Sequence, residues 1–247
     1  MPRIGTRKLY YLLKDEFTKE GIKVGRDKLF KMLKEQNMLI KKKRSYIQTT
    51  NSRHWMKKHP NMLKDEKSAK YDQIWVSDIT YIRTEEGFCF LAMITEARTR
   101  KIVGYDVSRS LSNDGVIRAL KQALKSRNKT LKTVHHSDRG FQYCSKEYVS
   151  LLIEAGIEIS MTENSDPYEN ALAERMNRTI KEEFLLAEKF KNMDIVSAII
   201  RESVRLYNEK RPHLSLGMNT PEMEYAKRIT SVGLRPPEVI LTNYFNN

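Results

Sequence analysis

The chain has 247 residues, of which 40% are hydrophobic, so it can bury a core in one or two domains and is not a disordered protein. Its formal net charge of +14 indicates a polyanionic partner. Residues 1–70 carry 20 Lys and Arg against 7 Asp and Glu, whereas residues 71–247 carry 25 against 24. This asymmetry favours a nucleic-acid-binding region joined to a nearly neutral body.

The two cysteines, Cys89 and Cys144, form no CxxC pair, so we expect neither a disulfide framework nor a zinc site. No apolar run approaches the ~18 residues of a membrane span. The N-terminus also lacks the charged and then apolar pattern of a signal peptide. We therefore expect a cytoplasmic protein that has no membrane partner.

Two short amphipathic helices are the first predicted elements, over residues 6–21 and 25–39. Apolar residues recur at helical spacing in both, and the Gly21–Gly25 stretch suits a tight turn between them. This arrangement suits a helix-turn-helix that binds DNA. A plain helical hairpin would show the same spacing, so that alternative stays open.

A basic run follows the second helix, at Lys41, Lys42, Lys43 and Arg44. Charge runs often form only a solvated surface, but this one extends a segment that is already basic, and we expect it to contact DNA. We assign residues 1–45 to a helical DNA-binding region. The polar and irregular residues 46–70 are predicted to be a linker.

Strands and helices alternate from residue 73 onward. Three strands, a helix, a strand, a helix and a strand are predicted over 73–82, 87–95, 101–109, 113–127, 131–138, 145–156 and 157–161. The first three strands should form an antiparallel meander, and the whole order predicts an α/β fold with helices covering a five-stranded sheet. Two further helices are predicted over 171–185 and 192–209. We assign 71–190 to a catalytic core and 191–247 to its helical extension.

Three acidic residues occupy informative positions in this pattern. Asp78 stands within the first buried strand, Asp138 ends the fourth strand in the sequence HHSDRG, and Glu174 lies in the first turn of a later helix. Simpler interpretations exist, because Asp138 can form a turn with Gly140 and Glu174 can pair with Arg178 along the helix. If the first and fourth strands are neighbours, however, the three carboxylates converge on one point.

Three converging carboxylates repel one another unless divalent cations bind them. Oxygen ligands suit Mg²⁺, with Mn²⁺ as the alternative, and a pair of such ions is suited to displacement at phosphorus. On a helical wheel Arg178 and Lys181 share the side of Glu174, so we expect both to face DNA. The preceding loop, residues 162–170, is rich in Asn, Asp and Pro, and we expect it to be mobile.

Four motifs carry a resemblance to a known family: WVSDITYI, HHSDRGFQYCS, PYENALAERMNRTIKEEF and YNEKRPHLSLGMNTPEMEY. With these motifs the chain resembles the transposases encoded by the second reading frame of bacterial insertion sequences, whose core is similar to that of retroviral integrases. The resemblance implies a mixed, ribonuclease-H-like sheet and Mg²⁺-dependent cleavage and joining of DNA. It also implies that Asp78, Asp138 and Glu174 are the catalytic metal ligands.

The resemblance further implies partners. We expect insertion-sequence ends and target DNA as substrates, a homo-oligomer on DNA, and a frameshift partner or fusion with the upstream reading-frame product. The protein would then work in the bacterial cytoplasm, at the nucleoid. Family members usually have more chain before the first helix, so we expect a shortened N-terminal region here.

Two other functions stay open at this point. A nuclease on the same fold would hydrolyse DNA without joining strands, and a transposon-derived DNA-binding protein would have lost catalysis. In the C-terminal extension, Arg211 and His213 are equally consistent with packing on the core and with contacting DNA.

Overall fold

The computed structural model describes residues 1–40, 55–63, 72–163 and 170–230. Its centre is a sheet with the strand order β3-β2-β1-β4-β5. The strands span Gln73–Thr84, Gly87–Glu96, Ile102–Ser108, Thr133–Ser137 and Glu158–Met161. Pairing is antiparallel among β1, β2 and β3, and parallel from β1 through β4 to β5. The predicted meander, the mixed five-stranded sheet and the pairing of the first and fourth strands are therefore confirmed.

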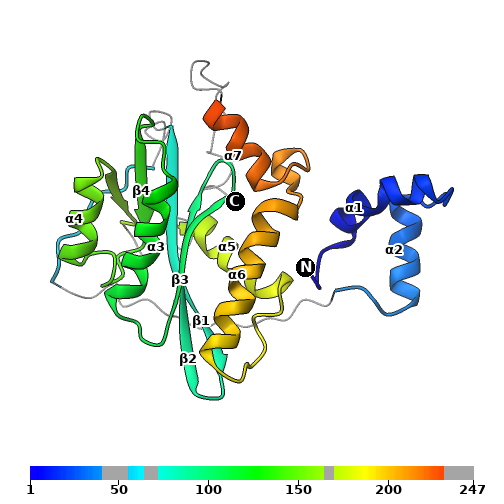
Figure 1. The fold of residues 1–247 in the computed structure, drawn as a ribbon, viewed down its shortest axis with the longest axis horizontal. Coiled ribbons are helices and arrows are strands. Elements are labelled where there is room, and N and C mark those ends of the chain that lie inside the picture. Colours follow the sequence, from blue (N-terminus) through cyan, green and yellow to red (C-terminus); the bar gives the residue numbers. More distant parts are fainter. Residues whose placement is uncertain (41–54, 64–71, 164–169, 231–247) are drawn as a thin grey trace.

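Helices cover both faces of the sheet (Figure 1). Helices α3 (Asn113–Ser126) and α4 (Lys146–Glu154) lie on one side, and α5 (Ala171–Glu183) and α6 (Met193–Lys210) lie on the other. Helix α7 (Pro221–Thr230) packs against α6. No helix in the described ranges is long and apolar enough to cross a membrane.

Strand β1 is buried on both faces because it is central, which explains its continuous apolar sequence. Val76 packs in one core cluster with Ile180 of α5 and Ile200 of α6. Trp75, its neighbour in sequence, points to the opposite face and packs in a second cluster that includes Leu120 of α3. The alternation along β1 thus fixes which residues face α5 and which face α3.

The N-terminal helices α1 (Thr6–Lys19) and α2 (Arg26–Glu35) pack against each other and stand beside the core (Figure 1). Gly21 has φ +67°, a left-handed conformation that ends the first helix at little steric cost. The segment before α1 contacts the core, where the backbone N–H of Arg3 donates to the Glu183 carbonyl, 3.2 Å away. The basic run at 41–44 lies outside the described residues.

Part of the predicted linker 46–70 packs against the sheet. The Met161 N–H donates to the Pro60 carbonyl at 3.2 Å, and the Met62 N–H donates to the Ser160 hydroxyl at 2.8 Å. Leu63 is buried in a core cluster. Residues 60–62 therefore run along β5, whereas most of the loop expected to be mobile, residues 164–169, is outside the described part of the chain.

Candidate active site

Asp78 and Asp138 leave the sheet from the same end of two parallel neighbours. Strand β4 pairs with β1 in register up to Ser137 opposite Ser77. Asp78 is therefore the first β1 residue beyond that pairing, and Asp138 is the first residue after β4. Because parallel strands end at a common edge, the two half-buried carboxylates meet there.

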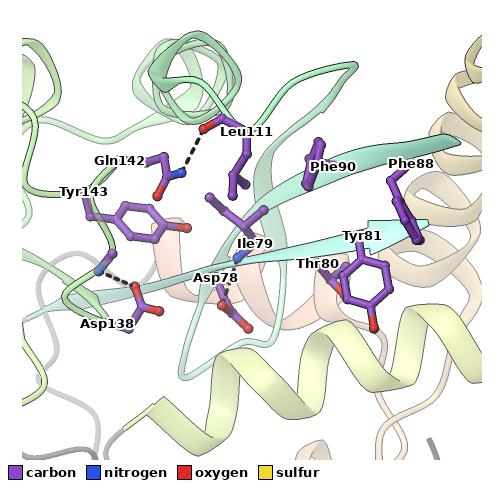
Figure 2. Close-up of a pocket in the computed structure, with 11 residues that line it drawn as sticks. Asp78, Ile79, Thr80, Tyr81, Phe88, Phe90, Leu111, Asp138, Gln142 and Tyr143 are labelled. Atoms are coloured by element: carbon purple, nitrogen blue, oxygen red, sulfur yellow. Dashed lines mark hydrogen bonds between the residues drawn. The ribbon is translucent and has the colours of Figure 1, made fainter. Parts of the chain in front are cut away.

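A cavity of about 260 Å³ opens beside these two carboxylates. Figure 2 shows both acids at one end of it and a row of aromatic side chains at the other. Its lining comes from β1, β2, the segment before α3 and the segment after β4: Asp78, Ile79, Thr80, Tyr81, Phe88, Phe90, Leu111, Asp138, Gly140, Gln142 and Tyr143.

A tight turn holds Asp138 in place. The Gly140 N–H donates to Oδ1 of Asp138 at 2.9 Å (Figure 2). A Cβ atom at residue 140 would lie 2.9 Å from the same Oδ1 and 3.4 Å from Oε1 of Gln142. A side chain at residue 140 would therefore displace the Asp138 carboxylate, so the predicted turn also helps to position this candidate ligand.

Asp78 has two hydrogen-bond donors and an unfavourable electrostatic environment. Its Oδ1 accepts from the Ile79 N–H at 2.8 Å, and its Oδ2 accepts from Nδ2 of Asn177 at 2.8 Å. Burial, followed by the charge of Asp138, raises the pKa of Asp78 to about 8, and Glu174 adds to this rise. The two hydrogen bonds oppose the increase.

Glu174 is exposed in the first turn of α5 and is not among the residues that line the cavity. Partial burial raises its pKa, Arg178 opposes this, and Asp138 contributes to the rise. Each of the three carboxyls therefore interacts with the others. Among the residues that the structure describes, no three His, Cys, Asp or Glu side chains are gathered closely enough to form a metal-binding group.

The donor set nevertheless fits a divalent cation. Three carboxylates supply only oxygen donors, which Mg²⁺ and Mn²⁺ prefer. Burial first, and then the charge of Asp138, raise the pKa of Asp78 and so disfavour its ionised form. A bound cation would offset both effects, because it favours the ionised form of a carboxyl.

Lys181 and Arg178, both predicted to face DNA, have different surroundings. The Lys181 ammonium donates to Oγ1 of Thr80 at 3.3 Å and to the Tyr81 carbonyl at 3.0 Å, so it joins α5 to β1. It also lies 4.6 Å from the centre of the Tyr81 ring. Arg178 is exposed, close enough to Glu174 to favour its ionised form.

The two histidines of HHSDRG face the core. Nε2 of His135 lies 2.9 Å from the hydroxyl of Tyr148, and Nδ1 of His136 lies 2.8 Å from that of Ser160. Burial lowers the pKa of His135 to about 3, so this side chain is neutral at physiological pH. These histidines support the strand that carries Asp138.

Arg211 and His213 pack on the core, the first of their two predicted roles. Arg211 is 5% exposed, and its guanidinium donates two hydrogen bonds to Glu183, at 2.6 and 2.7 Å. His213 is also buried and lies 2.7 Å from the guanidinium. A short 3₁₀ helix, Leu214–Leu216, follows.

The sequence did not reveal Asn177 or the aromatic wall of the cavity, which consists of Tyr81, Phe88 and Phe90. Asn177 is three residues after Glu174, hence on the same side of α5, and this spacing was a usable signal. The wall depends on the register between β1 and β2, which places Phe90 opposite Tyr81. Alternation alone does not reveal that register.

Comparisons with known proteins agree with this architecture. Residues 68–167 match a family model described as integrase core domain, and residues 155–221 match a second model with the same description. The catalytic core domain of BIV integrase has the same fold, with a TM-score of 0.50 and 18% sequence identity, covering 64% of this chain and 96% of that one.

Two proteins of Shigella sonnei are similar to this chain over most of their length. A 31 kDa protein of insertion element IS600 is 36% identical over 219 residues, which cover 88% of this chain and 79% of that protein. The transposase for insertion sequence element IS629 is 34% identical over 223 residues, covering 90% of this chain and 73% of that protein.

Proposed function

Because this chain belongs to the bacterial insertion-sequence transposases with an integrase core, and is thus a DNA transposase, we propose that Asp78, Asp138 and Glu174 form its catalytic site. The observation that carries the assignment is the placement of Asp78 and Asp138 at one end of a single cavity. Glu174 lies near enough for its charge to act on Asp78. A polynucleotidyl transferase requires such a cluster of oxygen ligands.

The reaction we propose is displacement at phosphorus with no bond to the protein. An oxygen of water or of a DNA 3′-hydroxyl loses its proton and forms a bond to phosphorus. The existing bond from phosphorus to the leaving 3′ oxygen breaks, and that oxygen takes up a proton. Integrase-type cores use a divalent metal, and bound Mg²⁺, or alternatively Mn²⁺, would supply Lewis-acid stabilisation of the charge that develops on the phosphate oxygens.

The residues of this chain would hold and orient the participants. Asp78, Asp138 and Glu174 would bind the cation, and Asn177 keeps the Asp78 carboxylate facing α5 through its 2.8 Å hydrogen bond. Arg178 is exposed beside Glu174 and would contact the DNA backbone. Lys181 would add positive charge next to the aromatic wall.

We also assign regions and partners. Residues 1–45, including the run from Lys41 to Arg44, would bind DNA, and residues 46–70 would link this region to the core. Residues 71–190 would form the catalytic core, and residues 191–247 would be its helical extension. Coupled cutting and joining of two element ends requires at least two sites, so we propose a homo-oligomer on DNA. A frameshift partner or fusion with the upstream reading-frame product would complete end recognition, in the cytoplasm at the nucleoid.

A strand-transfer assay tests this function. The full chain is incubated with Mg²⁺ and duplexes that copy the element's own ends, and both cleaved and joined products are quantified. Asp78→Asn, Asp138→Asn and Glu174→Gln should each abolish both products while DNA binding is retained. Cleavage without joining would instead favour a nuclease, and no product from the unmodified chain would favour a catalytically inactive DNA-binding protein.

A further inference from the structure

We propose that the cavity beside Asp78 and Asp138 receives one unstacked nucleobase of the DNA strand that is cut there. The inference rests on the proposed function, since it assumes that a phosphate of that strand lies at the carboxylates. It names a contact that determines how the strand is held, in addition to the carboxylates that act on its phosphate.

The apolar wall of the cavity is one continuous surface. Tyr81 pairs with Phe90 across β1 and β2, and Ile79 pairs with Ala92 two residues away, so these side chains lie on the same face of the sheet. Phe88 extends this surface and packs edge-on against Tyr81, with ring centres 5.4 Å apart. Figure 2 shows the three rings arranged along β1 and β2, at the end of the cavity away from the two aspartates.

The wall is preformed and accessible. The amide of Gln142 donates to the Leu111 carbonyl at 2.8 Å, which fixes the segment after β4 against the segment before α3. Phe88 is 53% exposed and Leu111 is 40% exposed, although both are large apolar side chains. An apolar surface of this kind beside a catalytic site is a binding surface more often than an accident of folding.

Three properties favour a nucleobase over an apolar protein segment as the occupant. Asp78 and Asp138 both line the cavity, so an occupant would lie close to a phosphate held at these residues. Lys181, which contacts Tyr81, places a positive charge at the aromatic end, where a phosphate of the same strand would follow. Bases also have flat π-faces that stack on aromatic side chains regardless of sequence.

Substitution of Phe88 tests the proposal, because Phe88 is mostly exposed and its loss should leave the fold intact. Cleavage is measured for the unmodified chain, Phe88→Ala and Phe88→Trp. Each protein is tested on intact duplexes and on duplexes that carry a single abasic site at each position flanking the cut phosphate. Ile153→Ala, an exposed apolar residue of α4 outside the cavity, is the matched control.

We expect Phe88→Ala to lower kcat/KM on intact DNA by about 5- to 150-fold, the range typical of losing one base–aromatic stack. Phe88→Trp should restore most of the lost kcat/KM. When the abasic site is at the nucleotide that enters the cavity, kcat/KM of the unmodified chain should fall to that of Phe88→Ala. The proposal would be overturned if Phe88→Ala lowered kcat/KM, relative to the unmodified chain, by the same factor on every duplex, including all abasic ones. It would also be overturned if Phe88→Ala lowered kcat/KM on none of them.

A binding measurement separates this inference from the proposed chemistry. 2-Aminopurine placed at the same nucleotide reports its unstacking by fluorescence, measured with Asp138→Asn so that no DNA is cut. The signal should change on binding of Asp138→Asn and should not change with the double variant Asp138→Asn/Phe88→Ala. Identical fluorescence changes with the single and the double variant would refute the nucleobase site but not the proposed chemistry. Cleavage by Asp138→Asn would refute the catalytic role of Asp138 but not the nucleobase site.

Discussion

The side-chain amide of Asn177 in α5 donates a hydrogen bond of 2.8 Å to Oδ2 of Asp78 in β1. Asn177 is 5% exposed and lies one turn after Glu174, so a single face of α5 supplies both a carboxylate and the donor that orients another carboxylate. The helix and the central strand are thereby joined at the candidate site. Changes at Asn177 should therefore affect the site before they affect the fold.

Asn177→Ala should weaken cation binding at the site. Without the amide, the Asp78 carboxylate can rotate away, and a hydrogen bond to a charged group typically contributes about 1.5–3 kcal/mol. We expect the Mg²⁺ concentration that gives half-maximal cleavage to rise about 10-fold or more. Asn208→Ala is the matched control, because Asn208 is buried and bonds the Ile102 backbone away from the site. If both variants shifted the Mg²⁺ dependence equally, the positioning role of Asn177 would be wrong.

Asp78→Asn should stabilise the metal-free protein at alkaline pH. The pKa of Asp78 is about 8 in the folded state, against 3.8 as its ordinary value. A raised folded pKa means that stability is fully present below pH 3.8 and is lost as pH rises towards 8. We expect the variant to melt about 2–4 °C above the unmodified chain at pH 8 without divalent cations.

The same melting experiment with Mg²⁺ provides the control for Asp78→Asn. A cation that binds the ionised carboxylates stabilises the folded chain by mass action. With Mg²⁺ the melting temperature of the unmodified protein should therefore rise to that of the variant, and the melting temperature of the variant should rise less. A difference in melting temperature between Asp78→Asn and the unmodified metal-free protein that stayed constant from pH 5 to pH 8.5 would contradict this account of Asp78.

The sheet and the two aspartates were predictable because their positions leave marks in the sequence. A strand that is buried on both faces has a continuous apolar run, and an acid inside or directly after such a run is conspicuous, as Asp78 and Asp138 are. Glu174 was less conspicuous, because an acid in the first turn of a helix is ordinary. Only the packing of α5 against β1, now observed, brings the helix of Glu174 next to Asp78.

The cavity wall could not be predicted, because it depends on register and on side-chain faces. Phe88 and Phe90 look like ordinary strand residues until β2 is aligned with β1, where Phe90 lies opposite Tyr81. Likewise, the role of Arg211 was open because its partner Glu183 is 28 residues away in sequence. Interactions of this kind depend on the tertiary fold, which local periodicity does not specify.

The basic run, which lies outside the described residues, should supply much of the electrostatic affinity for DNA. Changing Lys41, Lys42, Lys43 and Arg44 to Gln removes four positive charges. We expect weaker binding and a smaller salt dependence, with the slope of log Kobs against log[salt] flattened by up to about 0.9 for each DNA phosphate that the variant no longer neutralises. Titrating a fluorescent duplex at several salt concentrations measures both effects.

A matched set of four exposed lysines controls for total charge: Lys121, Lys125, Lys129 and Lys146. They lie on or near α3 and α4, on the opposite side of the sheet from α5. Their replacement by Gln lowers the net charge equally but should leave the salt slope nearly unchanged. Equal slopes for the two quadruple variants would show that the run does not contact DNA phosphates.

A largely buried cluster of Glu183, Arg211 and Lys8 should hold the N-terminal helices and the C-terminal extension to the end of α5. Glu183 accepts from Arg211 at 2.6 Å and from Lys8 at 2.9 Å. Burial alone would raise the pKa of Glu183, but its hydrogen bond with Arg211 and the charges of Arg211 and Lys8 lower it overall. Burial and the nearby cations Arg211, Lys8 and Arg100 lower the pKa of His213 to about 2.

Both shifts make the folded chain sensitive to acid. His213 stays neutral when folded but takes up a proton when unfolded, so stability should decline as pH falls below about 6.5. The lowered pKa of Glu183 adds a second loss as pH falls below 4.5. His213→Gln should remove the first loss, which melting temperatures between pH 7 and pH 5 will show.

Arg211→Ala should cost about 3–5 kcal/mol of unfolding free energy, because it leaves a buried carboxylate with only Lys8 as its partner. Arg205→Ala is the matched control: Arg205 donates to Glu202 at the same 2.6 Å, but both side chains are about half exposed, so water replaces the lost partner and little stability should be lost. Denaturant unfolding of the two variants at pH 7 measures the difference. Similar losses would show that burial does not distinguish these two ion pairs, and that Glu183 does not depend on Arg211.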